Sequence, residues 1–127
     1  MLVINGLTGK VICVEEAKGS VHDFEIFKQS GIRIHEDILL VGDKGFQGIC
    51  ELHAFSLIPL KKPKKGRLTA EQKAFNGNLS RFRILIEHVN RRIKRFKILQ
   101  MRYRNKQRKH LLRVSLICGI YNHELQF

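Results

Sequence analysis

Cysteine is scarce in this chain, and the few cysteines present form no recognisable pattern. Cys13, Cys50 and Cys118 are odd in number, far apart and each set among apolar residues. A disulfide framework normally uses an even set, and a structural zinc site uses closely spaced pairs, so neither is supported. The sequence instead predicts that all three are thiols in the core.

Long apolar runs are also missing. No stretch approaches the roughly 20 uncharged apolar residues that cross a bilayer, and the amino terminus lacks the basic and then apolar plan of a secretory signal. We therefore expect a soluble, cytoplasmic protein with no membrane partner. The chain has no tryptophan and only two prolines, yet 43% of its 127 residues are hydrophobic. That composition excludes a disordered or fibrous chain and predicts one compact domain, residues 1–127.

Acidic residues are rare where basic residues are concentrated. Residues 61–113 hold 19 Lys and Arg against only Glu71 and Glu87, a net charge of +17, while the rest of the chain carries −4. Such a field attracts polyanions, and each neutralised phosphate releases counterions, so affinity should fall steeply with salt. Nucleic acid is the partner that this distribution favours. A solvated basic face, or binding to an anionic membrane, is the alternative.

The order of the expected elements is that of an α/β protein with a mixed sheet. β-branched runs at residues 2–5 and 10–14 flank a Gly-containing turn and predict a hairpin. Ser20 and Asp23 have the spacing of a capping box and predict a short helix that ends near Gly31. Further expected elements follow in order: a buried strand at 38–41, a helical turn after Gln47, a strand at 56–60, a basic loop at 61–66, a helix from the Thr69/Gln72 capping box to about Leu99, a connector at 102–105 and a last helix at 110–125.

Two helices carry apolar residues at helical spacing. In the long helix the stripe consists of Phe82, Ile86, Val89, Ile93 and Phe96 and is expected to face the core. Glu87 lies about 100° round the helix from Ile86, so it falls at the margin of the stripe. In the last helix the expected apolar set is Leu111, Leu112, Val114, Ile117, Ile120, Tyr121 and Leu125, with His110 and Arg113 on the other side.

Two acids are placed for metal-dependent chemistry on a nucleic-acid backbone. Asp43 ends an apolar run and opens the turn Gly42-Asp43-Lys44-Gly45-Phe46-Gln47-Gly48, and Glu87 lies on the basic helix. Hard divalent cations prefer oxygen ligands, and phosphodiester attack uses such cations to help form the nucleophile and to stabilise the leaving oxygen. Each acid also has an ordinary explanation: Asp43 as an Asx-turn residue, and Glu87 as a surface partner of Arg83 or Arg91.

Four segments resemble the carboxy-terminal part of bacterial insertion-sequence transposases of the DDE superfamily, in the same order and over nearly the whole chain. They are Gly19-Ser20-Val21-His22-Asp23, the Gly42–Gly48 turn, Ile86-Glu87-His88-Val89-Asn90-Arg91-Arg92-Ile93-Lys94 and Gly119-Ile120-Tyr121-Asn122. The resemblance implies a ribonuclease H-like mixed sheet with flanking helices. It also implies metal-dependent DNA strand cleavage and transfer, with Asp43 as the second metal-binding acid and Glu87 as the third, around Mg²⁺ or Mn²⁺ in a two-metal site.

The resemblance also implies what is missing. The family's first Asp ends a central strand that would precede Met1, so we expect this chain to lack that strand and to be inactive alone. The turn departs from the commoner family pattern at Lys44, where a small residue is usual, and at Phe46, where Tyr is usual. Neither change removes a metal ligand. The missing part could come from an upstream polypeptide, and exposed strand edges could lead to self-association.

The remaining predicted site residues belong to the DNA interface and the surroundings of the acids. Contacts to DNA phosphates, at the ends of the insertion element and in the target DNA, are expected from Lys61, Lys62, Lys64, Lys65, Arg91, Arg92, Lys94 and Arg95. His22 is a candidate for a supporting position near the acids. Two other functions stay open: a non-catalytic basic nucleic-acid-binding protein, and a regulator that dimerises with a complete transposase.

Overall fold

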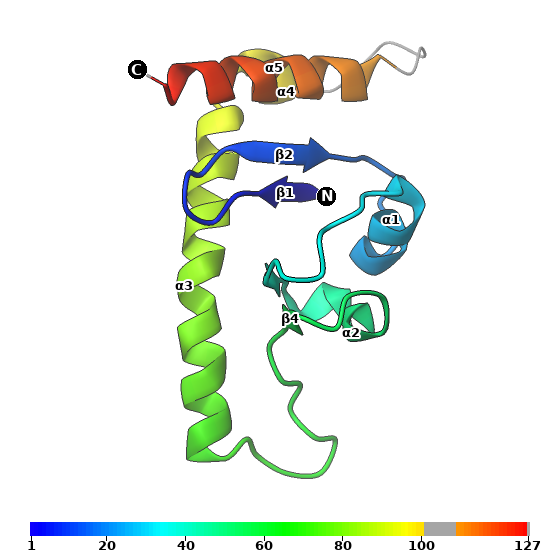
Figure 1. Ribbon diagram of the computed structural model, residues 1–127, viewed down its shortest axis with the longest axis vertical. Coiled ribbons are helices and arrows are strands. Elements are labelled where there is room, and N and C mark those ends of the chain that lie inside the picture. Colours follow the sequence, from blue (N-terminus) through cyan, green and yellow to red (C-terminus); the bar gives the residue numbers. More distant parts are fainter. Residues whose placement is uncertain (101–108, 127) are drawn as a thin grey trace. The chain divides into compact units, whose positions relative to one another are not determined.

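The computed structural model describes residues 1–100 and 109–126, and its helices and strands follow the predicted order with two short helical segments in addition (Figure 1). The chain divides into two compact units. Unit 1 comprises Met1–Glu16 and Leu85–Phe127, and unit 2 comprises Ala17–Ile84. The predicted connector at 102–105 lies outside the described residues. No described helix is long and apolar enough to cross a membrane.

Unit 1 begins with the predicted hairpin. Strand β1 (Leu2–Ile4) pairs antiparallel with β2 (Val11–Val14), with Leu2 opposite Val14 and a register shift between Val3 and Ile4. Gly9 closes the turn with φ +71°, a left-handed conformation that glycine adopts without steric cost. The Asn5 side chain accepts hydrogen bonds from the backbone N–H groups of Leu7 and Thr8, which fixes the start of the turn.

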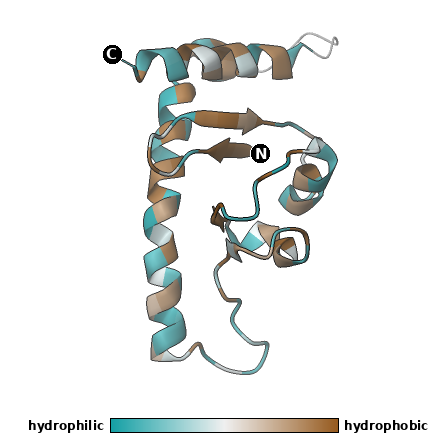
Figure 2. Cartoon of the chain, viewed as in Figure 1, coloured by the Kyte–Doolittle hydropathy of each residue, from teal (hydrophilic) through white to brown (hydrophobic). Residues whose placement is uncertain are grey.

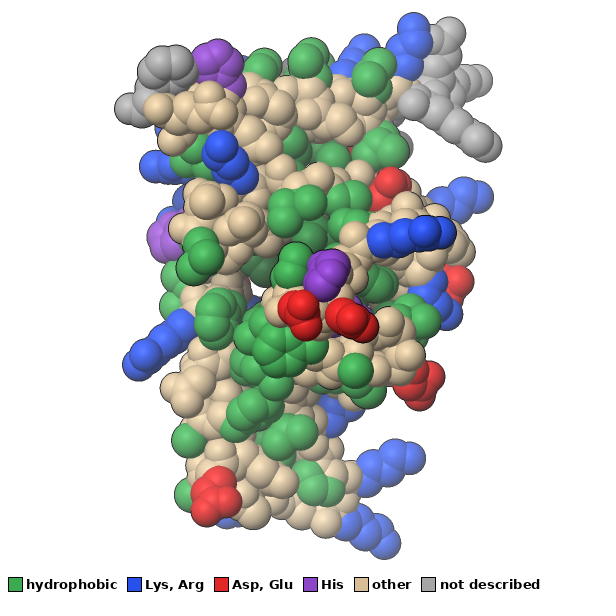
Figure 3. Space-filling view, viewed as in Figure 1, with side chains coloured by type: hydrophobic (Ala, Val, Ile, Leu, Met, Phe, Trp, Pro, Cys, Tyr) green, Lys and Arg blue, Asp and Glu red, His purple; other side chains and the backbone are tan. Residues whose placement is uncertain are grey.

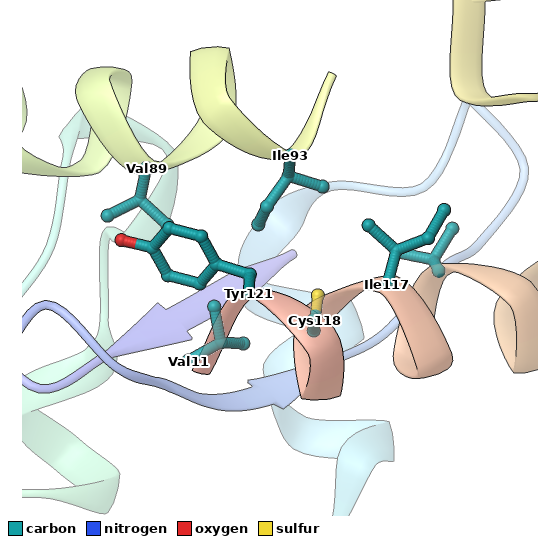
Figure 4. Packing of buried hydrophobic residues seen from close by; sticks show 7 residues of the cluster. Val11, Val89, Ile93, Ile117, Cys118 and Tyr121 are labelled. Carbon is teal, nitrogen blue, oxygen red and sulfur yellow. The ribbon is translucent and has the colours of Figure 1, made fainter. Parts of the chain in front are cut away.

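The core of unit 1 joins this hairpin to two helices. The carboxy-terminal part of α3 (Ala70–Ile93) contributes Val89 and Ile93, and α5 (His110–Glu124) contributes Ile117, Cys118 and Tyr121. Figure 4 shows these side chains pointing toward one another and toward Val11 of β2. Burial of such apolar surface stabilises the unit by about 25 cal/mol per Å² removed from water. The predicted stripe of the long helix is therefore confirmed at Val89 and Ile93.

Polar side chains of α5 tie that helix to the hairpin. The Asn122 amide forms two hydrogen bonds with one residue of β2: its Oδ1 accepts from the Val11 N–H at 2.7 Å and its Nδ2 donates to the Val11 carbonyl at 2.7 Å. One residue earlier, the buried Tyr121 hydroxyl donates to the Gly9 carbonyl at 3.3 Å. Asn122 therefore satisfies the backbone groups of Val11 as a neighbouring strand would.

Unit 2 holds two short helices and a second small sheet. Helix α1 (Asp23–Ser30) ends at Gly31, close to its predicted end, and Gly31 adopts a left-handed conformation with a φ of +64°. Strand β3 (Leu40–Val41) pairs in parallel with β4 (Ser56–Leu57), and the 3₁₀ helix η1 (Lys44–Phe46) and α2 (Ile49–Leu52) lie between them in sequence. The buried residues of this unit include Ile26, Phe27, Ile49 and Leu79, and the rings of Phe27 and Phe46 meet edge to face at 6.4 Å.

The start of α3 confirms the second predicted capping box. The Gln72 N–H donates to the Thr69 hydroxyl at 3.2 Å, and the Gln72 side chain accepts from the Thr69 N–H at 3.0 Å. One turn further on, the Asn76 side chain bonds both backbone groups of Leu60, at 2.8 and 3.1 Å. The chain segment before α3 is thereby fixed to the helix. After Ile93 a turn leads into α4 (Lys97–Gln100), so the long helix ends earlier than the predicted Leu99.

The strands form two separate two-stranded sheets, β1–β2 and β3–β4, within the part of the chain that the structure describes. The α/β class is confirmed, but the strand predicted at 38–41 is reduced to Leu40–Val41, which are half-buried, and the predicted burial is wrong at residues 38 and 39. Ile38 is 55% exposed and Leu39 40% exposed. The physical reason is that β3 is only two residues long and pairs with β4 on one side, so little covers the residues that lead into it.

Four other local predictions need correction. Helix α1 begins at Asp23 with His22 as its N-cap and no side-chain capping bond, so Ser20 and Asp23 do not form a capping box. Cys50 is exposed, whereas Cys118 is buried and Cys13 intermediate. Phe82 of the predicted stripe is 48% exposed. In α5, which is hydrophobic along much of its length (Figure 2), Leu112 and Ile120 are exposed and Arg113 is partly covered, because only one side of the helix packs on the core.

Candidate functional site

Asp43 lies directly after β3, at the point where the strand turns into η1. The strand is held by hydrogen bonds from the Leu40 N–H to the Phe55 carbonyl and from the Gly42 N–H to the Leu57 carbonyl, both 3.0 Å. Asp43 then caps η1: its Oδ1 accepts from the Gly45 N–H at 2.8 Å. This is an Asx turn, so the ordinary structural explanation of Asp43 describes its geometry correctly. In the described part of the chain, Oδ2 has no hydrogen-bond partner.

Two glycines of this turn lie where a side chain would be crowded. A Cβ at Gly42 would approach Phe46 to 3.3 Å, and a Cβ at Gly48, where φ is +92°, would approach the Phe24 ring to 3.2 Å. The backbone therefore packs closely against α1 and η1, and side chains at these positions would push the turn away. Gly45, which is exposed and has no side chain, also allows another backbone, such as that of a nucleic acid, to come near Asp43.

A second carboxylate lies beside Asp43, and sequence reasoning did not assign it to the site. A Cβ built on Gly45 would lie 3.0 Å from Asp43 Oδ1 and 3.1 Å from Asp23 Oδ2, so both oxygens border the same small space. Asp23 opens α1, and its expected role was only to start that helix. The available signal was the His22-Asp23 pair, which belongs to one of the four segments that carried the family resemblance.

His22 directly precedes Asp23 in the sequence and is exposed. Its backbone carbonyl accepts from the N–H groups of Glu25 and Ile26 at 2.9 and 3.1 Å, while its side chain makes no capping bond. His22 is therefore the N-cap of α1, at the amino-terminal end of the helix that Asp23 begins. Its supporting role stays a prediction.

Glu87 is exposed on the carboxy-terminal part of α3, in unit 1. It borders a concave surface together with three cationic side chains and two amides, and the full set is Glu87, Asn90, Arg91, Lys94, Arg95 and Gln100. The basic side chains lie where the helix ends, so they also meet the partial negative charge of the last backbone carbonyls. Three of the four helix residues predicted to bind DNA therefore share one surface with Glu87, and Arg92 is exposed but does not border it.

Gln100 gives this surface its shape. Its Nε2 donates to the Lys94 carbonyl at 2.6 Å across the turn between α3 and α4. The turn itself is closed by hydrogen bonds from the Arg95 N–H to the Arg92 carbonyl at 3.3 Å and from the Phe96 N–H to the Ile93 carbonyl at 3.2 Å. These hydrogen bonds fix the position of α4 relative to the charged end of α3.

The other predicted DNA-binding residues lie in unit 2. Lys61, Lys62, Lys64 and Lys65 are all exposed in the segment between β4 and α3, which is hydrophilic along most of its length (Figure 2). Each unit thus carries its own group of exposed cations. Asp43 and Glu87 are likewise divided, with Asp43 in unit 2 and Glu87 in unit 1. Among the described residues, no group of three His, Cys, Asp or Glu side chains is arranged to hold a metal ion.

The sequence of this chain matches a family profile over residues 1–122, a range that includes both acids, and the profile is described as DDE superfamily endonuclease. The chain belongs to the DDE superfamily endonucleases. It is also 50% identical over 124 residues to the protein described as "Probable transposase for insertion sequence element IS702" of Microchaete diplosiphon. The resemblance inferred from four short segments is thereby confirmed.

The match covers the two proteins unequally. It includes 98% of this chain but only 45% of the length of the relative from Microchaete diplosiphon, so the chain spans less than half of that protein. No solved structure matches the chain significantly. The α/β architecture, with its small sheets and flanking helices, is compatible with the nuclease fold of a DDE superfamily member.

Proposed function

We propose that this DDE superfamily chain is the carboxy-terminal part of a DNA transposase catalytic domain, in which Asp43 and Glu87 are two of the metal-binding acids. The observation that carries the proposal is the position of Asp43. It stands at a strand end, with one carboxylate oxygen fixed by the Gly45 N–H and the other without a hydrogen bond from the described residues. A carboxylate fixed in this way needs little reorganisation to take up a cation.

The donors fit a hard divalent cation, Mg²⁺ or Mn²⁺. The acids in question offer only oxygen atoms, which such ions prefer, and Asp23 adds a second carboxylate next to Asp43. When bound, the metal would supply charge stabilisation and activation of the attacking water or 3′-hydroxyl. Asp43 and Glu87 would hold it. Asp23 would raise the local negative charge, and His22 would contribute a proton donor or acceptor nearby.

The fold that this function requires is ribonuclease H-like, and in our proposal it is incomplete here. A central strand carrying the first metal-binding acid would be supplied by sequence that precedes these residues in a longer polypeptide. The relative's greater length supports this, because the match leaves more than half of that protein unaccounted for. With two of the three acids, the chain alone should show little or no strand cleavage or transfer.

DNA is the proposed partner, and its contacts would be mainly with phosphates. The exposed cations at 61–65 and at the end of α3 carry charge without a fixed pattern of donors for base edges. Arg91, Lys94 and Arg95 border the same concave surface as Glu87, which would bring a phosphate close to that acid. The ends of the insertion element and the target DNA would both experience this attraction, because it does not depend on the DNA sequence.

The experiment compares variants of the complete enzyme, meaning a polypeptide that includes the upstream part. Asp43→Asn and Glu87→Gln each remove a charge without changing shape, and both should lower DNA cleavage at least about 1,000-fold while leaving duplex affinity within about threefold. The matched control is Glu71→Gln, an exposed acid on the same helix α3. Retained cleavage in either acid variant would refute its assignment.

A non-catalytic nucleic-acid-binding protein is the second candidate, and one observation favours it. The described residues include exposed cations in both units. They include no group of three His, Cys, Asp or Glu side chains that could hold a metal ion. Binding without chemistry requires only the cations. The two candidates differ in the cleavage assay: a completed polypeptide that binds DNA and never cuts it, with Mg²⁺ or Mn²⁺ present, would establish the binding protein.

A further inference from the structure

Helix α5 has apolar residues on two opposite sides, and the core of unit 1 uses only one of them. Val114, Ile117, Cys118 and Tyr121 are buried. On the other side, Leu112 is 68% exposed, Leu116 66% and Ile120 41%. These three residues are spaced four apart, so they form one row along the helix, which we call the outer row. Figure 3 shows hydrophobic side chains standing out along the upper edge of the molecule, over α5.

The outer row has the composition of a small protein interface. Its centre is apolar, and its two ends are marked by the exposed charged residues Lys109 and Glu124. Ser115 and Gly119 lie beside the row and are exposed, and a Cβ at Gly119 would meet nothing within 4 Å. Small residues beside a leucine row let a second helix come close. An apolar centre with polar ends is the usual anatomy of a recognition surface.

The charges at the two ends distinguish between possible partners. If a second copy of α5 lies antiparallel on the first, Leu116 faces its own equivalent and Leu112 faces Ile120. Lys109 of one copy then comes near Glu124 of the other, and this happens twice because the arrangement has twofold symmetry. A parallel pair would instead bring like charges together at each end. Antiparallel helices also place opposite ends of their dipoles side by side.

We propose that the outer row of α5 is a dimerisation surface on which a second copy of this chain packs antiparallel about Leu116. The row between Lys109 and Glu124 is about 22 Å long at 1.5 Å per residue, and a helix pair of that length buries less than the roughly 1,200 Å² typical of a stable complex. The dimer is therefore in equilibrium with the monomer and depends on protein concentration. This inference is independent of the proposed chemistry, because none of its residues belongs to the candidate site.

Sedimentation equilibrium of the full chain tests the proposal. In about 0.3 M salt, which screens the repulsion between two copies of net charge +13, the wild type should move from monomer toward dimer as its concentration rises. Leu116→Glu should weaken dimerisation at least about tenfold. The control is Leu7→Glu, which introduces the same charge at a leucine that is 98% exposed in the hairpin turn. A wild type that stays monomeric, or equal effects of both variants, would overturn the proposal.

Charge exchange and cross-linking test the antiparallel arrangement. Lys109→Glu and Glu124→Lys should each weaken the dimer, and the double variant should recover most of the loss. In a Cys50→Ser background, Leu116→Cys should form a disulfide-linked dimer on oxidation faster than Leu7→Cys, because the dimer would hold its two thiols close together. No recovery in the double variant, or failure of Leu116→Cys to cross-link under conditions where the wild type dimerises, would overturn the arrangement. Circular dichroism of each variant checks that the helices are retained.

Discussion

Gly45 separates the carboxylates of Asp23 and Asp43, and its missing side chain keeps the space between them open. Its amide also provides the hydrogen bond that orients Asp43. A residue with no side chain thus performs two tasks at this site. The neighbouring atoms are the far ends of exposed or half-exposed side chains, so they can move without disturbing the core.

Replacing Gly45 should affect chemistry more than folding. In Gly45→Ala the new Cβ would approach Asp43 Oδ1 to 3.0 Å and Asp23 Oδ2 to 3.1 Å, so both carboxylates must shift. We expect cleavage by the complete enzyme to fall at least about tenfold. The free energy of unfolding should change by less than about 1 kcal/mol, because no buried contact is lost. Gly19→Ala, where a Cβ would meet nothing within 4 Å, is the control. Equal cleavage rates in both variants would contradict the role of Gly45.

The three thiols should differ in reactivity because their surroundings differ. Burial raises the pKa of the Cys118 thiol, and burial together with the nearby Glu15 charge raises the pKa of the Cys13 thiol. A raised pKa leaves less thiolate at a given pH, and thiolate is the form that reacts. At pH 7.5 iodoacetamide should therefore label the exposed Cys50 at least about tenfold faster than Cys118, and the rate at Cys118 should continue to rise with pH above 9. Mass spectrometry of timed samples measures this; equal rates would contradict the burial of Cys118.

At the scale of the element, two asparagines fix chain segments to helices in the same way. Asn122 bonds both backbone groups of Val11, and Asn76 bonds both backbone groups of Leu60. In each case one helix side chain satisfies a donor and an acceptor of a segment that is distant in sequence. The Leu60 bridge is exposed, whereas the Val11 bridge is partly buried and holds a residue of the short strand β2. A backbone group that is left unpaired and shielded from water costs about 1–3 kcal/mol, so the bridge to Val11 contributes more.

Removing the Asn122 bridge should destabilise unit 1. Asn122→Ala leaves the N–H and the carbonyl of Val11 without this partner, and we expect the free energy of unfolding to fall by about 2 kcal/mol. Asn122→Asp keeps the acceptor for the Val11 N–H but faces the Val11 carbonyl with another oxygen, so it should recover little of the loss. The control is Asn78→Ala, an exposed asparagine on α3, with a change below about 0.5 kcal/mol. Urea denaturation curves measure these values, and equal losses at both positions would contradict the bridge.

At the scale of the whole molecule, the main feature is the uneven distribution of charge along the chain. The net charge of +17 in residues 61–113 falls on both units, since the lysines at 61–65 belong to unit 2 and the cations after Glu87 belong to unit 1. Each unit therefore attracts a polyanion through its own cations. The outer row of α5 is the other feature that depends on the whole molecule, because its exposure requires that the rest of unit 1 leaves it uncovered.

DNA affinity should follow counterion release. If four phosphates are neutralised, the affinity for a short duplex should fall about 50-fold between 0.1 and 0.3 M salt. Lys64→Ala should lower the slope of log affinity against log salt by about 0.9, whereas Lys18→Ala, an exposed lysine outside residues 61–113, should leave the slope unchanged. Fluorescence anisotropy gives both slopes. A flat salt response would exclude phosphate contact as the main contribution.

The sequence by itself determined the features that are local in the chain. The hairpin, the end of α1 near Gly31, the Thr69/Gln72 capping box and the position of Asp43 after a strand depend on residues a few positions apart, so their pattern can be recognised without the fold. The same holds for the two acids and the basic residues as candidates. It holds for family membership too, because the ordered segments are a property of the sequence.

Only the tertiary structure decided which of these residues meet and which apolar surfaces are covered. It placed Asp23 beside Asp43, exposed Cys50, Phe82 and residues 38–39, and divided the apolar residues of α5 into a buried side and an outer row. The reason is physical. A side chain is buried by neighbours that come from distant parts of the chain, and helical periodicity shows that a residue is apolar without showing which side finds a partner.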